Sequence, residues 1–277
     1  MNRFAQGSFA AAALLLVLAG CKKDGQQDVV TATPEQVATP VETAPGAAPV
    51  NLSDVIEHTP SYVVGISYPP AAAKYPGLAQ ELTSYAEHAK AELLKAASEL
   101  GNDKPTAPYE LSLSFDMLTD TPKVVAVSAD GSSYTGGAHG QPLVARFVWL
   151  PEQQKLLKAE DLINTAKGWQ AVSDYVEDKL LEQATVRAQG EELSPEEQQE
   201  QVRNLSRMID EGTAPEPANF SQFQPVLDAA GHISALRFVF PPYQVGPYSD
   251  GTQFVDVPAA ALLPNVAADY RELFSRN

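Results

Sequence analysis

A single cysteine, Cys21, in a sequence of 277 residues limits how this chain can be stabilised. With one thiol no intrachain disulfide can form, so the chain lacks the cross-link on which many small exported domains depend. A hydrophobic core must therefore hold the fold. Hydrophobic residues make up 44% of the sequence, which is enough for one large or two modest globular domains.

The segment before Cys21 has the layout of an export signal. Arg3 lies in a short N-terminal region, and an apolar run follows at residues 9–19. A membrane-spanning helix needs about 20 apolar residues, so we expect residues 1–20 to be a cleaved signal peptide. The tetrapeptide LAGC at 18–21 resembles the bacterial lipobox, in which cleavage exposes the cysteine for modification with diacylglycerol. We therefore predict that Cys21 is the lipid attachment site and that its acyl chains anchor the protein to a membrane.

The residues after Cys21 indicate where the anchor is placed. Lys22 and Lys23 stand where an Asp would resemble an inner-membrane retention signal, so we expect the outer membrane, with the domain facing the periplasm. Residues 21–52 are rich in Gln, Thr, Ala and Pro and hold few large apolar side chains. That composition is typical of an extended, disordered tether.

The first predicted module, residues 53–129, combines strands with one long helix. Apolar residues recur every three or four positions over 77–100 and predict an amphipathic helix. The dipeptide Asp130-Gly131, at the start of the next module, is a turn signal. Strands are predicted at 62–68, 109–115 and 123–129.

The second predicted module, residues 130–277, again contains both kinds of element. One helix is expected from Gly168. A second begins with a capping box at Ser194 and Glu197 and ends at Gly212. Strands are predicted at 142–150, 220–227, 233–240 and 253–257. Because strands and helices come in blocks, the pattern favours an α+β fold in which antiparallel sheets are packed by a few amphipathic helices.

Two stretches of the chain, YTGGAH at 134–139 and FVFPPYQVGPYSDG at 238–251, carry a family resemblance. They resemble the signature shared by RsiV-type lysozyme-sensing anti-sigma factors and the accessory region of PdaC-type peptidoglycan deacetylases. The resemblance covers most of residues 109–275, and residues 53–123 fit the companion N-terminal module more loosely. It implies a binding domain that recognises lysozyme or another cell-wall-related partner.

The sequence departs from this family in two places. Gly246 stands where the family usually has Ala, and no cytoplasmic anti-sigma segment precedes the domain. We therefore do not expect a signal to pass to a sigma factor.

The two motifs supply the candidate partner-binding residues. Glycine permits positive φ, histidine can lock a loop through either ring nitrogen, and tyrosine offers a large contact area with a polar tip. The alternative is that these residues only define turns and core. The candidates are Tyr134, Gly136, Gly137, His139, Tyr243 and Tyr248.

Catalytic motifs are absent from the sequence, which contains no G-x-S-x-G, S-x-x-K, H-E-x-x-H, Walker or G-x-G-x-x-G pattern. His58, His88, His139 and His232 are far apart, so we expect no metal site, no cofactor and no enzyme activity. A PdaC-like catalytic domain carries metal-binding histidines and an Asp-Asp pair, and this chain has no such pair. The acidic cluster at 191–200 could suggest glycan cleavage, but it flanks a helix start and is interpreted as solvated.

The charge of the chain bears on its partners. The formal net charge is −16, and loss of residues 1–20, with Arg3 and no acidic residue, makes it −17. Such a chain repels nucleic acid and suits a basic partner such as lysozyme, although the charge could also serve solubility alone. The leading hypothesis is a non-catalytic binding domain. The alternatives are a structural or assembly lipoprotein that contacts peptidoglycan or other envelope proteins, and an unrecognised hydrolase.

Overall fold

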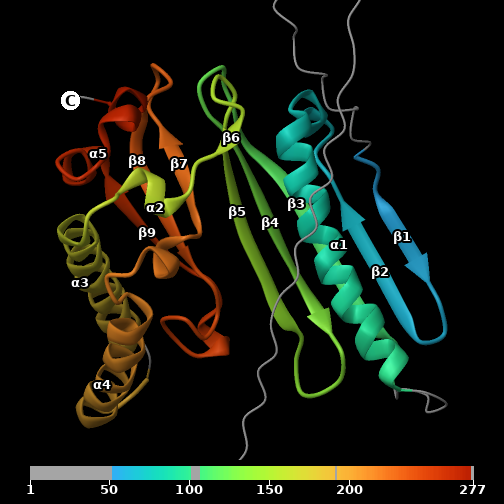
Figure 1. The fold of residues 1–277 in the computed structure, drawn as a ribbon. Coiled ribbons are helices and arrows are strands. Elements are labelled where there is room, and N and C mark those ends of the chain that lie inside the picture. Colours follow the sequence, from blue (N-terminus) through green and yellow to red (C-terminus); the bar gives the residue numbers. More distant parts are fainter. Residues whose placement is uncertain (1–51, 101–106, 191, 276–277) are drawn as a thin grey trace, which may run out of the picture. The chain divides into compact units, whose positions relative to one another are not determined.

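The computed structural model describes residues 52–100, 107–190 and 192–275. The predicted signal peptide, Cys21 and the tether up to residue 51 lie outside these ranges. No helix within them is long and apolar enough to cross a membrane. The described residues form two β-sheets accompanied by helices (Figure 1), so the predicted α+β class is confirmed.

Sheet A contains six strands in the order of the sequence. Most neighbours are antiparallel, as predicted, but β2 and β3 are parallel. Parallel neighbours require a crossover connection, and the chain supplies one through η1 (Pro70–Lys74) and α1 (Pro76–Glu99). The strands are β1 (Val55–His58), β2 (Tyr62–Ser67), β3 (Tyr109–Asp120), β4 (Val125–Tyr134), β5 (Gln141–Leu150) and β6 (Lys155–Leu156).

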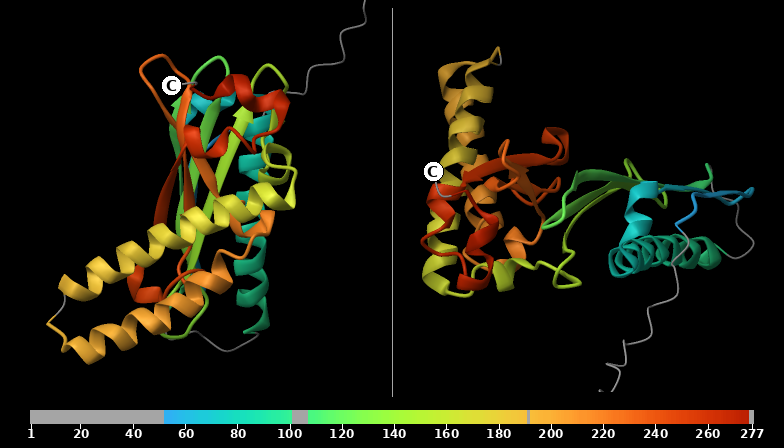
Figure 2. Two further views of the ribbon diagram at one scale, coloured as in Figure 1. Left: turned by 90° about the vertical axis from the view of Figure 1, so that its left-hand side faces the viewer. Right: turned by 90° about the horizontal axis from the view of Figure 1, so that it is seen from above.

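Helix α1 covers one face of sheet A (Figure 2). Its buried side chains recur with helical spacing, as predicted, and include Leu78, Leu82 and Leu93. They pack against the alternating apolar residues of β2 to β5 in one core cluster. A Cβ at Gly77 would lie 2.4 Å from Cη2 of Trp149, so the glycine lets the indole pack directly against the helix backbone.

The predicted turn at Asp130-Gly131 is wrong, because both residues lie inside β4, opposite Ser114 and Leu113 of β3. A Cβ at Gly131 would lie 2.0 Å from the backbone oxygen of Ser112. The glycine is therefore needed for close approach of two strands and not for a turn. The turn of this hairpin comes later, between Tyr134 and Gln141.

Asp120, at the end of β3, is bound to the segment that leads into α1. Its carboxylate accepts hydrogen bonds from Tyr75 Oη at 2.6 Å and from Lys74 Nζ at 2.9 Å. The Tyr75 hydrogen bond and then Lys74 hold the pKa of Asp120 below its ordinary 3.8. The same hydrogen bond is the main cause that raises the pKa of Tyr75 above 10.0.

Asp120→Asn is expected to weaken the dependence of the free energy of unfolding on pH in the acidic range. A lowered pKa in the folded state stabilises the fold above pH 3.8, and that stabilisation disappears as the pH falls through the folded-state pKa. Urea unfolding at pH 7 and pH 3 should show a larger loss for the variant at pH 7. Asp116→Asn, in the same strand, is the control. An equal loss for Asp120→Asn at both pH values would contradict the prediction.

Sheet B contains three antiparallel strands in the order of the sequence. They are β7 (Phe223–Leu227), β8 (Ile233–Phe240) and β9 (Gln253–Pro258). The accompanying helices are α2 (Ala159–Leu162), α3 (Ala166–Gly190), α4 (Pro195–Gly212) and α5 (Ala259–Leu262), with the 3-10 helices η2 (Pro217–Phe220), η3 (Tyr248–Asp250) and η4 (Ala268–Leu273). The core between them is aromatic: Trp169 stacks on Phe220 at 5.3 Å between ring centroids, and Phe220 meets Phe238 edge to face.

The start of α4 confirms the predicted capping box. Ser194 Oγ accepts from the backbone N–H of Glu197 at 3.3 Å, and the Glu197 carboxylate accepts from the backbone N–H of Ser194 at 2.8 Å. The strand predicted from residue 220 starts later, because Phe220 ends η2 and is fully buried in the core. Strand β7 begins at Phe223.

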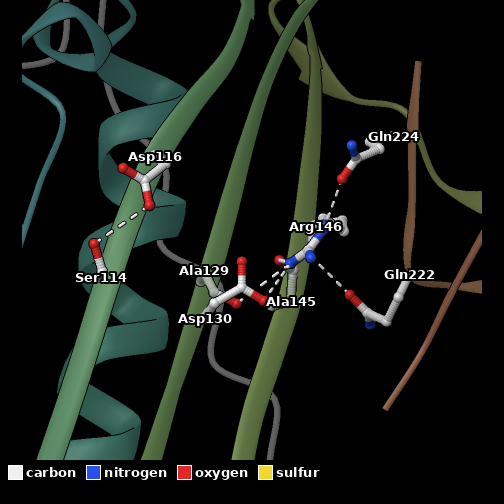
Figure 3. Close-up of polar contacts among 8 residues, drawn as sticks. All are labelled: Ser114, Asp116, Ala129, Asp130, Ala145, Arg146, Gln222 and Gln224. Atoms are coloured by element: carbon white, nitrogen blue, oxygen red, sulfur yellow. Dashed lines mark hydrogen bonds and ion pairs between the residues drawn. The ribbon is translucent and has the colours of Figure 1, made fainter. Parts of the chain in front are cut away.

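Arg146 on β5 links the two sheets by hydrogen bonds (Figure 3). Its guanidinium donates to Gln224 Oε1 at 2.9 Å and to Asp130 Oδ1 at 3.0 Å, and its backbone N–H donates to Gln222 Oε1 at 2.8 Å. The Arg146 side chain is only 5% exposed. The side-chain amide of Gln222 thus accepts from a backbone N–H of β5, as a carbonyl of a neighbouring strand would.

Along the chain, sheet A ends with β6 and sheet B begins with β7. Both sheets belong to one compact unit. The predicted boundary between residues 129 and 130 falls within β4. The division into the modules 53–129 and 130–277 stays a prediction.

Candidate functional site

Three of the six predicted partner-binding residues form one aromatic cluster. His139 lies in the β4–β5 turn, and Tyr243 and Tyr248 lie in the loop between β8 and β9. Tyr243 Oη is 2.8 Å from His139 Nε2, and the rings of His139 and Tyr248 stack at 4.0 Å between centroids and 17° between planes. The two tyrosine rings are 5.7 Å apart. Residues more than a hundred positions apart in sequence therefore form one site.

The other three candidates shape the β4–β5 turn. Gly136 and Gly137 have φ of 99° and 98°, which other residues rarely adopt. An added Cβ at either glycine would meet nothing within 4 Å, so the requirement is conformational and not steric. Tyr134 Oη donates to the backbone oxygen of Gly137 at 3.2 Å. Tyr134 thus stabilises the turn that presents His139.

Hydrogen bonds at both ring nitrogens hold His139. Nδ1 is 3.1 Å from the backbone oxygen of Gly140, and a carbonyl can only accept, so Nδ1 carries the proton of the neutral ring. Nε2 then accepts from the hydroxyl of Tyr243. In this arrangement His139 joins the turn of sheet A to the loop of sheet B.

The loop that carries the tyrosines is tight. Tyr243 has a φ of 75°, one of the few positive values at a non-glycine residue in the described chain. Its backbone N–H donates to Gly246 O at 2.9 Å, and that of Gln244 donates to Pro241 O at 3.1 Å. A non-glycine residue in this region costs about 1–3 kcal/mol. The surrounding contacts must therefore hold Tyr243 in place.

The β8–β9 loop is also held by residues that the sequence did not indicate: the backbone of Gly212 and Asn219, and the side chain of Arg187. Gln244 Nε2 donates to Gly212 O at 2.9 Å and to Asn219 O at 2.8 Å. Arg187 Nη1 of α3 lies 3.1 Å from Asp250 Oδ2. Gln244 and Asp250 stood inside the recognised motif, but no pattern in the sequence pointed to Gly212, Asn219 or Arg187 as their partners.

The family departure at Gly246 also lies in this loop. A Cβ there would be 3.2 Å from Asp250 Oδ2, the oxygen that pairs with Arg187. Alanine would thus require the carboxylate to move by a few tenths of an ångström. The glycine lets Asp250 stay in its present pair with Arg187.

The front of the cluster is open to solvent. Tyr243 is 50% exposed and Tyr248 is 37% exposed, while His139 is half-buried. Exposed tyrosines with fixed positions are typical of recognition surfaces, because they bury a large area on binding at little entropic cost. Within residues 52–100, 107–190 and 192–275, no three His, Cys, Asp or Glu side chains are grouped so that they could hold a metal ion.

One sequence family model matches part of the chain. Residues 56–141 match the family model described as deacetylase PdaC. The match runs from the second residue of β1 to the first residue of β5. It includes the YTGGAH motif but not the second motif at 238–251. No curated protein matches the chain.

Two solved structures match most of the chain at low sequence identity. A DUF3298 family protein from Pseudomonas aeruginosa PAO1 is 16% identical with a TM-score of 0.50, covering 81% of this chain and 94% of that one. A member of the same family from Bacteroides fragilis NCTC 9343 is 15% identical with a TM-score of 0.47, covering 79% and 94%. At this identity the first of these supports the fold alone. The expected likeness to lysozyme-sensing anti-sigma factors stays a prediction.

Proposed function

We propose that this chain is a lipid-anchored lipoprotein of the bacterial envelope whose α+β domain binds a protein partner. The binding edge consists of the β4–β5 turn and the β8–β9 loop. One observation carries the proposal: His139, Tyr243 and Tyr248 converge from two sheets into a single exposed aromatic cluster. We propose binding and not catalysis because the cluster presents two large aromatic rings, Tyr243 and Tyr248, to solvent.

The cluster of His139, Tyr243 and Tyr248 suits binding because its supporting contacts fix it in place while its tyrosine rings remain exposed. Buried groups hold the β8–β9 loop, as Val245 lies in the core and Gln244 is hydrogen-bonded to two backbone oxygens. A surface that is already ordered loses little conformational entropy on association. The positive φ of Tyr243 is consistent with a position kept for function despite its cost.

The proposed partner is a basic, cell-wall-related protein, with lysozyme as the candidate that the family resemblance supplies. The formal net charge of −16 favours fast association with a cationic surface. We further propose that Cys21 carries the lipid and that the tether lets the domain extend from the outer membrane into the periplasm. No role in nucleic-acid binding is proposed.

Removal of either tyrosine ring is expected to weaken this binding. The full chain, purified in a non-ionic detergent, would be titrated with hen lysozyme at low salt. Tyr243→Ala and Tyr248→Ala are each expected to raise Kd about tenfold, as is typical of an aromatic interface residue worth somewhat more than 1 kcal/mol. Leu118→Ala is the matched control, since Leu118 is 40% exposed but lies at the opposite end of sheet A.

Two results would contradict the proposal. One is no binding of lysozyme or other basic proteins at low salt. The other is binding that Tyr243→Ala and Tyr248→Ala leave unchanged. Binding to purified peptidoglycan in the absence of any basic protein partner would instead support the structural or assembly role.

A further inference from the structure

A groove of about 370 Å³ lies between α1 and the β4–β5 hairpin. The helix lines it with residues three or four positions apart, among them Tyr85, Ala89 and Ala96, which therefore share one face. Leu143 of β5 completes an apolar floor. The Tyr85 ring is fixed there by edge-to-face contacts with Phe115 and Phe147.

One carboxylate lies at the rim of this groove. Glu92 and the imidazole of His88 are the only titratable lining groups apart from Tyr85. Nearby Lys90 does not neutralise the groove, because it pairs with Glu57 of β1. Across the part of the chain that the structure describes, the side chain of Glu92 makes neither a hydrogen bond nor an ion pair. The groove thus combines an apolar floor, an aromatic ring and an unpaired negative charge.

These features of the groove are complementary to an arginine side chain. Arginine has an aliphatic stem that packs on apolar surface and a planar cation that stacks on aromatic rings and pairs with carboxylates. A purely apolar side chain would gain nothing from the charge of Glu92. A carboxylate ligand would be repelled by Glu92 and by the overall charge of −16.

We infer that this groove receives an arginine side chain of the basic partner, with its stem on Ala89, Ala96 and Leu143 and its guanidinium beside Glu92. The inference rests on the proposed function and names a second contact for the same partner. Ser133, Thr135 and Gln141 line the groove and flank the turn that carries His139. A protein bound to that turn would therefore reach both the aromatic cluster and the groove.

Arginine amide serves as the probe for the groove itself. The full chain in non-ionic detergent, with ¹³C-labelled tyrosine, would be titrated while the Tyr85 ring signal is followed by NMR. Arginine amide is expected to bind saturably and about tenfold more tightly than citrulline amide, which has the same shape without the charge. Glu92→Gln should remove that difference. Glu87→Gln, an exposed carboxylate of α1 outside the groove, should preserve it.

A second variant separates groove shape from charge. Ala96→Leu fills the floor and leaves Glu92 in place, so it should abolish saturable binding of arginine amide. Equal binding of arginine and citrulline amides, or no saturable change at Tyr85, would overturn the inference.

Lysozyme titrations separate failure of the inference from failure of the proposed function. If Tyr248→Ala weakens lysozyme binding and Glu92→Gln does not, the groove inference is wrong and the proposed function stands. If arginine amide binds at Tyr85 but no basic protein binds the chain, the proposed function fails, and only the preference of the groove for a guanidinium group stands.

Discussion

Arg146→Met is expected to lower the free energy of unfolding by about 3 kcal/mol. The variant keeps most of the aliphatic volume but loses the guanidinium, which is hydrogen-bonded to Gln224, Asp130 and the backbone oxygen of Ala145. Removal of one partner from a buried ion pair costs about 3–5 kcal/mol. The lower end applies because Asp130 is 48% exposed and can be hydrated after the loss.

Urea unfolding of the full chain would measure this effect against Arg237→Met. Arg237 makes two hydrogen bonds to Asp256, at 2.7 and 2.8 Å, so its pairing is at least as good. Its side chain is 41% exposed, however, and exposed pairs contribute about 0–1 kcal/mol. Losses of similar size for the two variants would contradict the view that Arg146 joins the sheets through buried contacts.

Gly212→Ala is expected to destabilise the protein by about 3 kcal/mol and to displace the β8–β9 loop. A Cβ at residue 212 would lie 2.0 Å from the backbone oxygen of Gln244. Because the clashing atom is backbone, either α4 or the loop must move. Movement would break the hydrogen bonds from Gln244 to Gly212 and Asn219 and separate Tyr243 from His139.

Gly190→Ala is the matched control, because Gly190 also ends a helix and an added Cβ there would meet nothing within 4 Å. It should leave the free energy of unfolding unchanged or raise it slightly. Loss of the ring-current shift between His139 and Tyr248 in NMR spectra of Gly212→Ala would report the loop displacement. An intact shift together with unchanged stability would show that the close approach is not needed.

Local patterns in the sequence predicted much of this fold. The apolar repeat predicted α1 almost to the residue, and the capping box predicted the start of α4, since both depend on neighbours within a few positions. Alternation likewise predicted β3, β5 and β8. The turn signal at Asp130-Gly131 failed because a contact with Ser112 on another strand determines the need for glycine there.

Long-range pairing lay beyond what these patterns could predict. The parallel pairing of β2 with β3 and the strand β1 depend on how distant segments meet. The six candidate residues came from motif resemblance, and the structure brings His139, Tyr243 and Tyr248 together. Their supporting contacts, such as Gln244 with Gly212, join residues about thirty positions apart and leave no local pattern.

The contacts of Arg146 with Gln222 and Gln224 can form only late in folding, because both glutamines follow sheet A in the sequence. All strands of sheet A lie within residues 55–156, so this sheet is expected to form before Gln222 and Gln224 have been synthesised. Until they arrive, the N–H of Arg146 faces water along an unprotected strand edge, which invites pairing with another chain. A chain truncated before residue 222 is therefore expected to self-associate through β5, and closure of that edge marks the point at which the domain becomes resistant to aggregation.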